Sequence, residues 1–312
     1  MKVDHSLTKP FNKVIITGVT GYIGMALAKK LLKNGVSVYG VGRNIKKMAL
    51  LKQYNNFFPV IADFIEYDKL ATLINDRNFD MFWHFAWQGT NNGEYNDYDV
   101  QIVNIRAACD AAVSAVSLDS NKISFACSNY QKGKTNNTPE DLNLNPIYYG
   151  TIKQCASDLY KAIAYKNNIP CINIILPNTF GPYGRDNTAI FLFIKRLLLN
   201  EPLNLINGNY QDDWMPIDDI VDGVISASMS TLKNADYYVG HRHITTFREK
   251  IIEMKHVLNS SSKLNWGEYP DYFHVDYSCF DLDALYRDTG WEAKISFADS
   301  ILQTAEWVKT II

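Results

Sequence analysis

Short apolar segments alternate with longer amphipathic segments through the first half of the chain. Six apolar runs have the length of buried strands, and they lie at 13–18, 36–42, 59–64, 80–87, 122–128 and 170–176. Three longer segments carry apolar residues at helical spacing, at 21–35, 100–116 and 148–168. This alternation predicts an α/β fold in which a doubly wound parallel sheet is covered by helices on both faces.

The regular alternation ends after residue 176. Proline and glycine cluster at 177–184, a further helix is predicted near 188–199, and the remainder mixes loops, short strands and helices. We therefore expect a sheet domain over 1–176, to which 215–245 partly returns. A smaller mixed α/β lobe is expected over 177–312.

Composition and charge exclude several classes of protein. The net charge is −2 and no basic block is present, so nucleic acid is not an expected partner. No apolar run approaches the ~20 residues that span a bilayer, and the polar start with Asp4 is no secretory signal. The five cysteines lack paired spacing and the six histidines lack metal-ligand spacing. These features predict a cytoplasmic protein with reduced thiols and no metal site.

A glycine-rich turn follows the first predicted strand. Gly18, Gly21 and Gly24 stand at GxxGxxG spacing where the first helix begins. Such glycines permit a tight turn and a close approach of the backbone to a pyrophosphate, while the helix N-terminus favours negative charge. The turn therefore predicts dinucleotide binding on a Rossmann-type sheet, with a plain tight turn as the alternative. Other cofactor contacts expected in this turn are Thr20, Tyr22 and Ile23.

The end of the second strand bears on the choice of cofactor. NAD sites usually carry an acid there for the ribose 2′-hydroxyl, whereas this chain has Gly42, Arg43 and Asn44. The Arg43 guanidinium is suited to a 2′-phosphate, so the sequence favours NADP over NAD. The alternative is that Arg43 lies on the adenine or points to solvent.

A tyrosine and a lysine lie one helical turn apart in the third helix. Tyr149 and Lys153 share a helix face, and Ser128 ends the preceding strand. A nearby ammonium would lower the pKa of the phenol, so that Tyr149 exchanges a proton with a substrate oxygen. Lys153 would also hold the nicotinamide ribose, and Ser128 would donate a hydrogen bond to the same substrate oxygen. The three residues predict catalysis of hydride transfer.

Several motifs together resemble the extended short-chain dehydrogenase/reductase family, in its nucleotide-sugar epimerase/dehydratase group. They are TGVTGYIG, HFAWQGT, YYGTIK, PNTFGPYG and MPIDDIVDGV, and the segment 280–307 resembles the family's closing segment. The resemblance implies that Asp63 and Phe64 bracket the adenine and that Phe85 and Ala86 run beside the pyrophosphate and ribose. It also implies cofactor-site roles for Trp87, Asn104, Pro177 and Asn178, although core packing is an equal alternative for Trp87.

The residues after Ser128 narrow the reaction. Dehydratases of this group carry an Asp-Glu pair there, whereas this chain has Asn129 and Tyr130, which argues against dehydration. The GRNIKK and CSNYQKG segments resemble CDP-abequose synthase-type reductases. The leading hypothesis is thus NADPH-dependent reduction of a 4-keto deoxysugar nucleotide. The alternatives are a nucleotide-sugar epimerase with bound NAD, and a cofactor-binding sensor or scaffold without turnover.

Arginines that grip the substrate diphosphate in the family are absent from their usual places. Ile175, Asp212 and Asp271 stand at or near those places. The cations that would replace them, unless they are solvated surface charges, are Arg185, Lys195, Arg196, Arg242 and Arg248. The resemblance further implies a homodimer, formed through the helices near 100–116 and 148–167.

Overall fold

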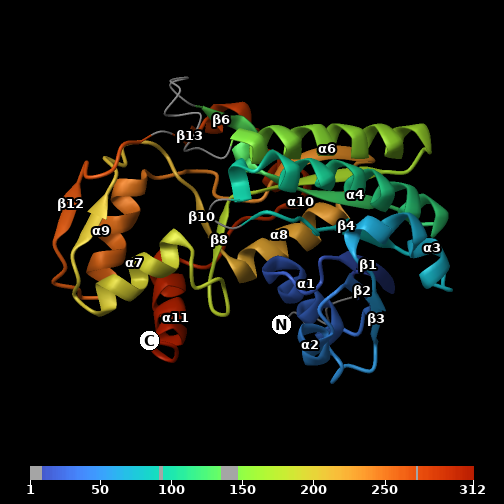
Figure 1. Ribbon diagram of the computed structural model, residues 1–312, viewed down its shortest axis with the longest axis horizontal. Helices are drawn as coiled ribbons and strands as arrows, with labels where there is room; N and C mark the ends of the chain where they lie inside the picture. Colours follow the sequence, from blue (N-terminus) through green and yellow to red (C-terminus); the bar gives the residue numbers. More distant parts are fainter. Residues whose placement is uncertain (1–8, 91–93, 135–146, 272) are drawn as a thin grey trace, which may run out of the picture.

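The computed structural model describes residues 9–90, 94–134, 147–271 and 273–312. A seven-stranded sheet with the strand order β11-β7-β5-β4-β1-β2-β3 runs through the larger part of the molecule (Figure 1). All neighbouring strands in it are parallel. The strands are β1 (Lys13–Thr17), β2 (Ser37–Gly42), β3 (Phe57–Ile61), β4 (Met81–His84), β5 (Ile123–Ser128), β7 (Cys171–Leu176) and β11 (Asn234–Tyr238).

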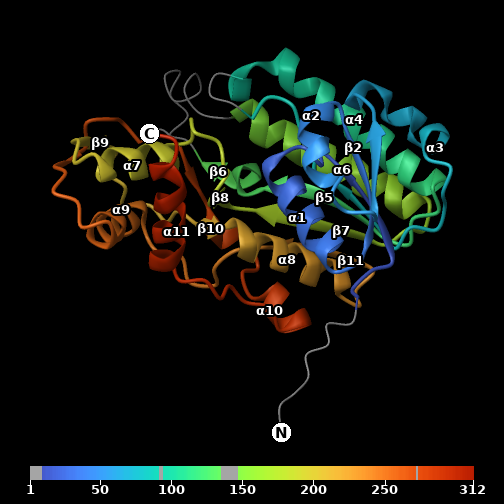
Figure 2. The same cartoon turned by 90° about the horizontal axis from the view of Figure 1, so that it is seen from below.

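Helices cover both faces of this sheet (Figures 1 and 2). On one face α4 (Tyr98–Ser117) packs against α6 (Ile147–Lys166), and on the other α1 (Tyr22–Lys33) packs against α8 (Ile217–Met229). The α4 contact surface is built from alanines, Ala107, Ala108, Ala111, Ala112 and Ala115, all of them buried. Small side chains let this helix lie close to its neighbours. The prediction of a doubly wound parallel α/β fold is confirmed.

The strand order reverses between β1 and β4, which are neighbours in the sheet. From β1 the chain proceeds outward to β2 and β3, and from β4 it proceeds the other way to β5, β7 and β11. The loops that leave β1 and β4 therefore diverge at the same edge and open a crevice there. In open α/β sheets, ligands bind at such a point.

Short elements connect the strands and helices of the sheet layer. They are α2 (Ile45–Met48), η1 (Ala49–Leu51), η2 (Phe64–Lys69), α3 (Leu70–Leu73), η3 (Glu94–Asn96), η4 (Asn129–Lys132) and β6 (Gly133–Lys134). Near the C-terminus, η5 (Tyr277–Cys279) is followed by α10 (Ala284–Thr289), which lies against α8 and β11.

A second layer of structure forms a lobe beside the carboxyl ends of the strands (Figure 1). Helices α7 (Ala189–Leu198), α9 (Phe247–Val257) and α11 (Phe297–Lys309) enclose its apolar core. Three two-stranded sheets complete it: β8 (Asn178–Phe180) with β10 (Trp214–Pro216), β9 (Leu203–Leu205) with β12 (Leu264–Trp266), and β6 with β13 (His274–Val275). Residues 217–238 leave the lobe and supply α8 and β11 to the main sheet layer. The boundary at residue 176 remains an expectation.

Two predicted strands extend further along the chain than the observed ones, beyond differences of one residue elsewhere. The third strand ends at Ile61 and not at residue 64, because Asp63 caps the N-terminus of η2 in a capping box with Glu66. The fourth strand ends at His84 and not at residue 87, because Phe85, Ala86 and Trp87 leave the sheet to line the crevice. In the described part of the chain, no helix is long and apolar enough to cross a membrane.

Candidate active site

A cavity of about 640 Å³ lies between the carboxyl edge of the sheet and the lobe. The sheet side contributes the glycine turn and the ends of β2, β4 and β5, while the lobe side contributes the residues around β8, α7 and β10. Predicted site residues that line it are Gly18, Thr20, Gly21, Tyr22, Ile23, Gly24, Arg43, Phe64, Phe85, Ala86, Trp87, Ser128, Tyr149, Lys153, Pro177 and Asn178. Asn44, Asp63 and Asn104 are not among the residues that line it.

The glycine turn has no room for side chains at two of its positions. Gly18 adopts the left-handed conformation, with φ of 72°, and a Cβ there would lie 2.7 Å from the backbone nitrogen of Ala86. A Cβ at Gly24 would collide with the carbonyl oxygen of Gly18. Gly21 precedes α1 and gives it no side-chain cap, so N–H groups of the first turn remain available to a ligand. The turn thus has the form expected of a phosphate cradle.

The loop after β4 is held from behind by two buried amides of α4. Asn104 accepts a hydrogen bond from Gln88 N at 2.8 Å and donates one to Gln88 O at 3.1 Å. Gln101 donates to Gly89 O at 2.6 Å and accepts from Trp87 Nε1 at 3.0 Å. Asn104 therefore supports the cavity wall and does not reach the cavity. The sequence analysis did not identify Gln101 as a site residue. The only signal in the sequence is that Gln101 is a polar residue within the apolar stripe of a predicted helix.

Beyond β2 and β3 the cavity ends beside an ion pair. Arg43 Nη1 lies 3.2 Å from Asp63 Oδ2, and the guanidinium lies 5.9 Å from the centre of the Phe64 ring. Asn44 turns away, because its side chain accepts a hydrogen bond from Lys47 N and caps α2. Arg43 thus borders the cavity with an acid already beside it, and this acid comes from the start of η2 and not from the end of β2.

Ser128, Tyr149 and Lys153 converge on the middle of the cavity. Ser128 ends β5, and its side chain lies close enough to the Tyr149 phenol to lower the pKa of that phenol. One turn along α6, Lys153 donates to the carbonyl oxygen of Ala126 at 2.7 Å. The strand end and the helix that follows it therefore bring Ser128 together with the tyrosine–lysine pair of α6.

Burial dominates the protonation of this group. It raises the pKa of Tyr149 well above the ordinary value of a phenol, although the hydrogen bond with Ser128 and the charge of Arg185 act in the opposite direction. Burial also lowers the pKa of Lys153 to about 7. The expectation that Lys153 lowers the Tyr149 pKa is therefore not met, because burial is the largest influence on the phenol and Lys153 is not among the groups that lower its pKa.

Aromatic rings surround the Tyr149 phenol on several sides. Tyr95 meets it edge-to-face at a centroid distance of 4.9 Å, and Tyr130 and Trp87 do so at 6.0 Å each. Tyr130 occupies the place at which dehydratases have the second residue of their acid pair, and it lines the cavity. Tyr95 was not predicted as a site residue, since nothing in its local sequence indicates that η3 folds over α6.

Arg185 brings a cation to the lobe side of the cavity. Its guanidinium donates to Thr90 O at 2.7 Å and to Thr90 Oγ1 at 2.6 Å, and its charge lowers the pKa of both Tyr95 and Tyr149. Of the other cations considered, Arg242 pairs with Asp283 and Arg248 donates to Asn207 O. Neither these two nor Lys195 and Arg196 line the cavity.

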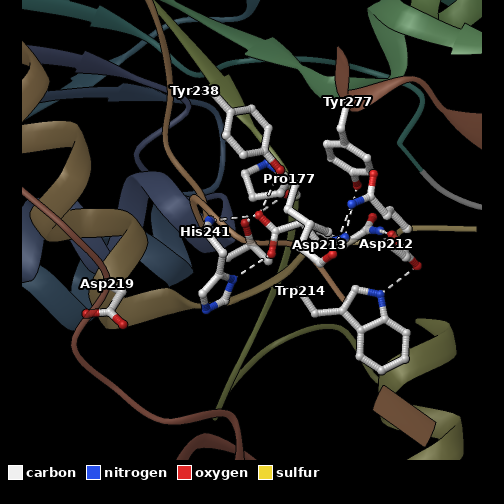
Figure 3. A network of polar contacts seen from close by, with 12 residues as sticks. Pro177, Asp212, Asp213, Trp214, Asp219, Tyr238, His241 and Tyr277 are labelled. Atoms are coloured by element: carbon white, nitrogen blue, oxygen red, sulfur yellow. Dashed lines mark hydrogen bonds and ion pairs between the residues drawn. The ribbon is translucent and has the colours of Figure 1, made fainter. Parts of the chain in front are cut away.

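Two adjacent acids stand where the lobe meets the cavity (Figure 3). Asp213 is fully buried and accepts from the Tyr238 hydroxyl at 2.8 Å and from His241 N at 2.9 Å. Asp212 lines the cavity, and its oxygens accept from Asn178 Nδ2 at 2.9 Å and from Trp214 Nε1 at 2.8 Å. Burial raises the Asp212 pKa to about 7. Asp213 thus supports the fold, whereas Asp212 faces the ligand space.

Comparison with known proteins settles the family. Residues 14–240 match the model of the NAD dependent epimerase/dehydratase family. The chain belongs to this family. A curated UDP-glucuronate 4-epimerase of Thermodesulfobacterium geofontis is 24% identical over 95% of this chain and 95% of its own length. A UDP-glucose 4-epimerase of Mycolicibacterium smegmatis is 23% identical over 95% of this chain and 98% of its own.

Solved structures support the same fold for this epimerase/dehydratase-family enzyme. The UDP-glucuronic acid 4-epimerase of Bacillus cereus, in complex with NAD, aligns with a TM-score of 0.77 at 19% identity. The alignment covers 96% of this chain and 97% of that one. The predicted resemblance to extended short-chain dehydrogenase/reductases is thereby confirmed, and so is the expectation of an enzyme.

The cavity of this family member fits a dinucleotide by its own geometry. The cradle at Gly18 and Gly24 admits no side chain, and the first turn of α1 lacks a side-chain cap. Arg43 and Phe64 border the far end beyond β2, where the adenosine would lie, and Lys153 borders the end near Tyr149. In the described part of the chain, no group of three or more potential ligand side chains could hold a metal ion.

Proposed function

We propose that the enzyme is a nucleotide-sugar 4-epimerase that works with retained NAD. The observation that carries this proposal is that Tyr149, Ser128 and Lys153 line the same cavity as the glycine turn. The names of the relatives, UDP-glucuronate and UDP-glucose 4-epimerases, support this reading over the reduction of a 4-keto sugar. Their sugar chemistry needs a proton-transferring group and a hydride-transferring cofactor side by side.

Each residue of the group has one role in this reaction. Tyr149 removes the proton from the 4-hydroxyl of the sugar and returns it once the sugar has presented its other face. Ser128 donates a hydrogen bond to the same oxygen and stabilises charge that develops there. Lys153 supplies a positive charge beside the phenol. When bound, NAD provides a reversible acceptor for the hydride, so no net oxidation or reduction results.

The lobe supplies the binding of the substrate. Arg185 is held by Thr90 and lies close enough to Tyr149 to lower the pKa of the phenol. A planar guanidinium binds phosphate and carboxylate groups in a bidentate manner. Arg185 therefore supports a substrate with an anionic group near the reacting sugar, as a diphosphate or a hexuronate would provide.

The test begins with the purified enzyme and no added cofactor. Heat release followed by mass spectrometry identifies any retained dinucleotide. The enzyme is then incubated separately with UDP-glucose and UDP-glucuronate, and the 4-epimers are separated by anion-exchange chromatography. Retained NAD and formation of either 4-epimer support the proposal. An enzyme that binds NAD yet converts neither sugar contradicts it.

Arg43 favours a second candidate, the NADPH-dependent reduction of a 4-keto sugar nucleotide. No carboxylate stands at Gly42, and the Arg43 side chain is 65% exposed at the edge of the cavity. Against this candidate, Asp63 already pairs with Arg43 and would repel a 2′-phosphate. Oxidation of NADPH by a 4-keto sugar nucleotide, lost in Arg43→Ala, would favour the reductase. If neither assay shows turnover, the remaining hypothesis is a cofactor-binding scaffold without catalytic activity.

A further inference from the structure

Lys153 occupies an apolar site without a counter-ion. The residue is 4% exposed, and its ammonium donates a hydrogen bond to the carbonyl oxygen of Ala126 at 2.7 Å. In the part of the chain that the structure describes, no carboxylate forms an ion pair with it. A buried charge without a partner is strongly disfavoured. Some other group must therefore stabilise the ammonium.

The indole of Trp87 takes that place. Lys153 Nζ lies 3.8 Å from the centre of the Trp87 ring and 4.9 Å from that of Phe125. An ammonium over an indole face is attracted by the negative face of the ring, and the attraction is larger when the site is desolvated. The same indole packs edge-to-face on Tyr149, so it contacts both members of the pair.

Gln101 fixes the orientation of this indole. The Gln101 side chain is fully buried and accepts from Trp87 Nε1 at 3.0 Å, while its amide donates to Gly89 O at 2.6 Å and to Glu94 O at 3.0 Å. All these partners belong to the segment that leaves β4. The ring therefore cannot turn its edge toward Lys153 without breaking the Nε1 hydrogen bond.

We propose that Trp87 is a positioning residue that keeps Lys153 charged and in place through its indole face, with Gln101 as the support that aims the ring. The alternative is that Trp87 only packs in the core. In that case the shape of its side chain would matter for the Lys153 site, and its π face would not. This effect of Trp87 on Lys153 does not depend on which reaction the enzyme catalyses. Only its consequence for turnover rests on the proposed 4-epimerase function.

The other titratable groups that face Lys153 carry no charge near neutral pH. Burial lowers the pKa of His84 on β4 to about 3, and burial raises the pKa of Cys127 on β5 to about 12. Tyr149, on the same helix as Lys153, has its pKa raised as well. Because burial lowers the pKa of Lys153 to about 7, a contact that favours the ammonium raises the charged fraction of the amine at physiological pH.

The test measures the titration of Lys153 directly in the enzyme without substrate. Lysine labelled with ¹³C at Cε gives a resonance whose shift reports the charge, and Lys153→Met assigns it. Trp87→Leu removes the π face and should move the titration down by about one pH unit, since a desolvated cation–π contact is worth about that much. Trp87→Phe keeps a π face and should shift it less. Gln101→Leu should fall between wild type and Trp87→Leu.

Two outcomes overturn the proposal. One is a Lys153 titration in Trp87→Leu that matches wild type within about 0.2 pH units, which is well below the expected cation–π shift. The other is an equal shift in Trp87→Phe and Trp87→Leu, which would indicate repacking.

Far-UV circular dichroism and thermal melting confirm that each variant is folded. If Trp87→Leu does not fold, Trp87→Phe and Gln101→Leu still test the order of the shifts. The alkaline limb of the epimerisation pH profile should move with the titration, whereas a failed epimerisation assay leaves the titration measurable.

Discussion

A single tyrosine acquires its role from its surroundings. The chain has 19 tyrosines, and Tyr148 and Tyr149 are consecutive in α6, yet only the second of this pair lines the cavity. Tyr148 is 44% exposed and packs on Tyr98 at the surface. The proximity of Ser128 and the surrounding aromatic side chains distinguish Tyr149. These two residues form a matched pair for mutation.

Tyr149→Phe should abolish most of the turnover. It removes the proton-transferring hydroxyl and leaves the ring in its aromatic surroundings, so kcat should fall by about 10²–10⁴-fold. Tyr148→Phe is the control and should retain wild-type kcat. Both variants should retain dinucleotide to the same extent as the wild type. Equal activities in Tyr149→Phe and wild type would exclude the phenol from the chemistry.

Asp212 should make the folded state sensitive to pH. Burial raises its pKa from 3.8 to about 7, so the folded chain keeps a proton that the unfolded chain loses. The resulting stabilisation is full below pH 4 and is lost as pH rises through about 7. Asp212→Asn cannot titrate, so its free energy of unfolding should fall less than that of wild type between pH 5 and pH 8.

Urea unfolding at both pH values measures this difference. Glu201→Gln, at an exposed position, is the control and should follow the wild-type pH dependence. The comparison is between slopes, because the amide of Asp212→Asn also loses one acceptor toward Asn178 or Trp214. Parallel pH dependences of wild type and Asp212→Asn would show that the carboxyl is ionised throughout.

At the scale of elements, the sequence predicts the sheet layer well because its signals are local. Buried parallel strands appear as apolar runs, and α1 and α6 carry regular apolar stripes. The strand β11 was not predicted. It lies at the edge of the sheet and begins with polar residues, and of its five residues only the last two, Tyr237 and Tyr238, are buried. The second kind of error is a strand predicted to continue where the chain leaves the sheet. This happens at Phe85, where tertiary hydrogen bonds decide the end of β4.

The glycine turn can be tested against a glycine of the same conformation. Gly18 and Gly35 have φ of 72° and 75°, but a Cβ at Gly35 meets nothing within 4 Å. Alanine in the left-handed conformation costs ~1–2 kcal/mol at either position. Gly18→Ala adds the collision with Ala86, so it should lose more free energy of unfolding than Gly35→Ala. It should also lose retained dinucleotide, which Gly35→Ala should keep. Equal losses in both variants would show that the turn has room to adapt.

At the scale of the whole molecule, the cavity depends on contacts that no local pattern reveals. Ser128, Tyr149 and the glycine turn belong to recognisable motifs, so the sequence places them in the site. Arg185 and Asp212 reach the cavity because the lobe folds over the sheet edge, and Thr90 receives Arg185 from a position 95 residues away in the chain. Five cations were possible substitutes for the missing arginines, and the fold brings Arg185 alone of these five to the cavity.

Removal of the Arg185 charge should weaken substrate binding. A hydrogen bond to a charged group is worth about 1.5–3 kcal/mol, so Arg185→Met should raise KM for the UDP-sugar by about ten- to a hundred-fold. Arg196→Met is the control, because this arginine lies on α7, away from the cavity, and is exposed. Initial rates over a range of substrate concentrations measure both. An unchanged KM in Arg185→Met would mean that another group binds the anion.

The exposed faces of α4 and α6 predict a homodimer. They lie side by side on the outside of the molecule (Figure 1) and expose the apolar side chains Tyr98, Ile102, Val103, Val113, Tyr148, Leu159 and Tyr165. Exposed apolar side chains that gather on two neighbouring helices are typical of an interface between protein chains. Two such helix pairs would form a four-helix bundle across a twofold axis, in which each copy covers the apolar face of the other.

One charge placed in this face should separate the copies. Val113→Lys puts an ammonium into the interface, where burial without a partner is strongly disfavoured, so light scattering should report the mass of one chain, 35.5 kDa. Ile252→Lys on α9 is the matched control, because Val113 and Ile252 are both 51% exposed. That variant should keep the mass of the wild-type dimer. A wild-type mass of 35.5 kDa would refute the dimer directly. A dimeric Val113→Lys would place the interface elsewhere, since an exposed lysine away from the contact leaves association unchanged.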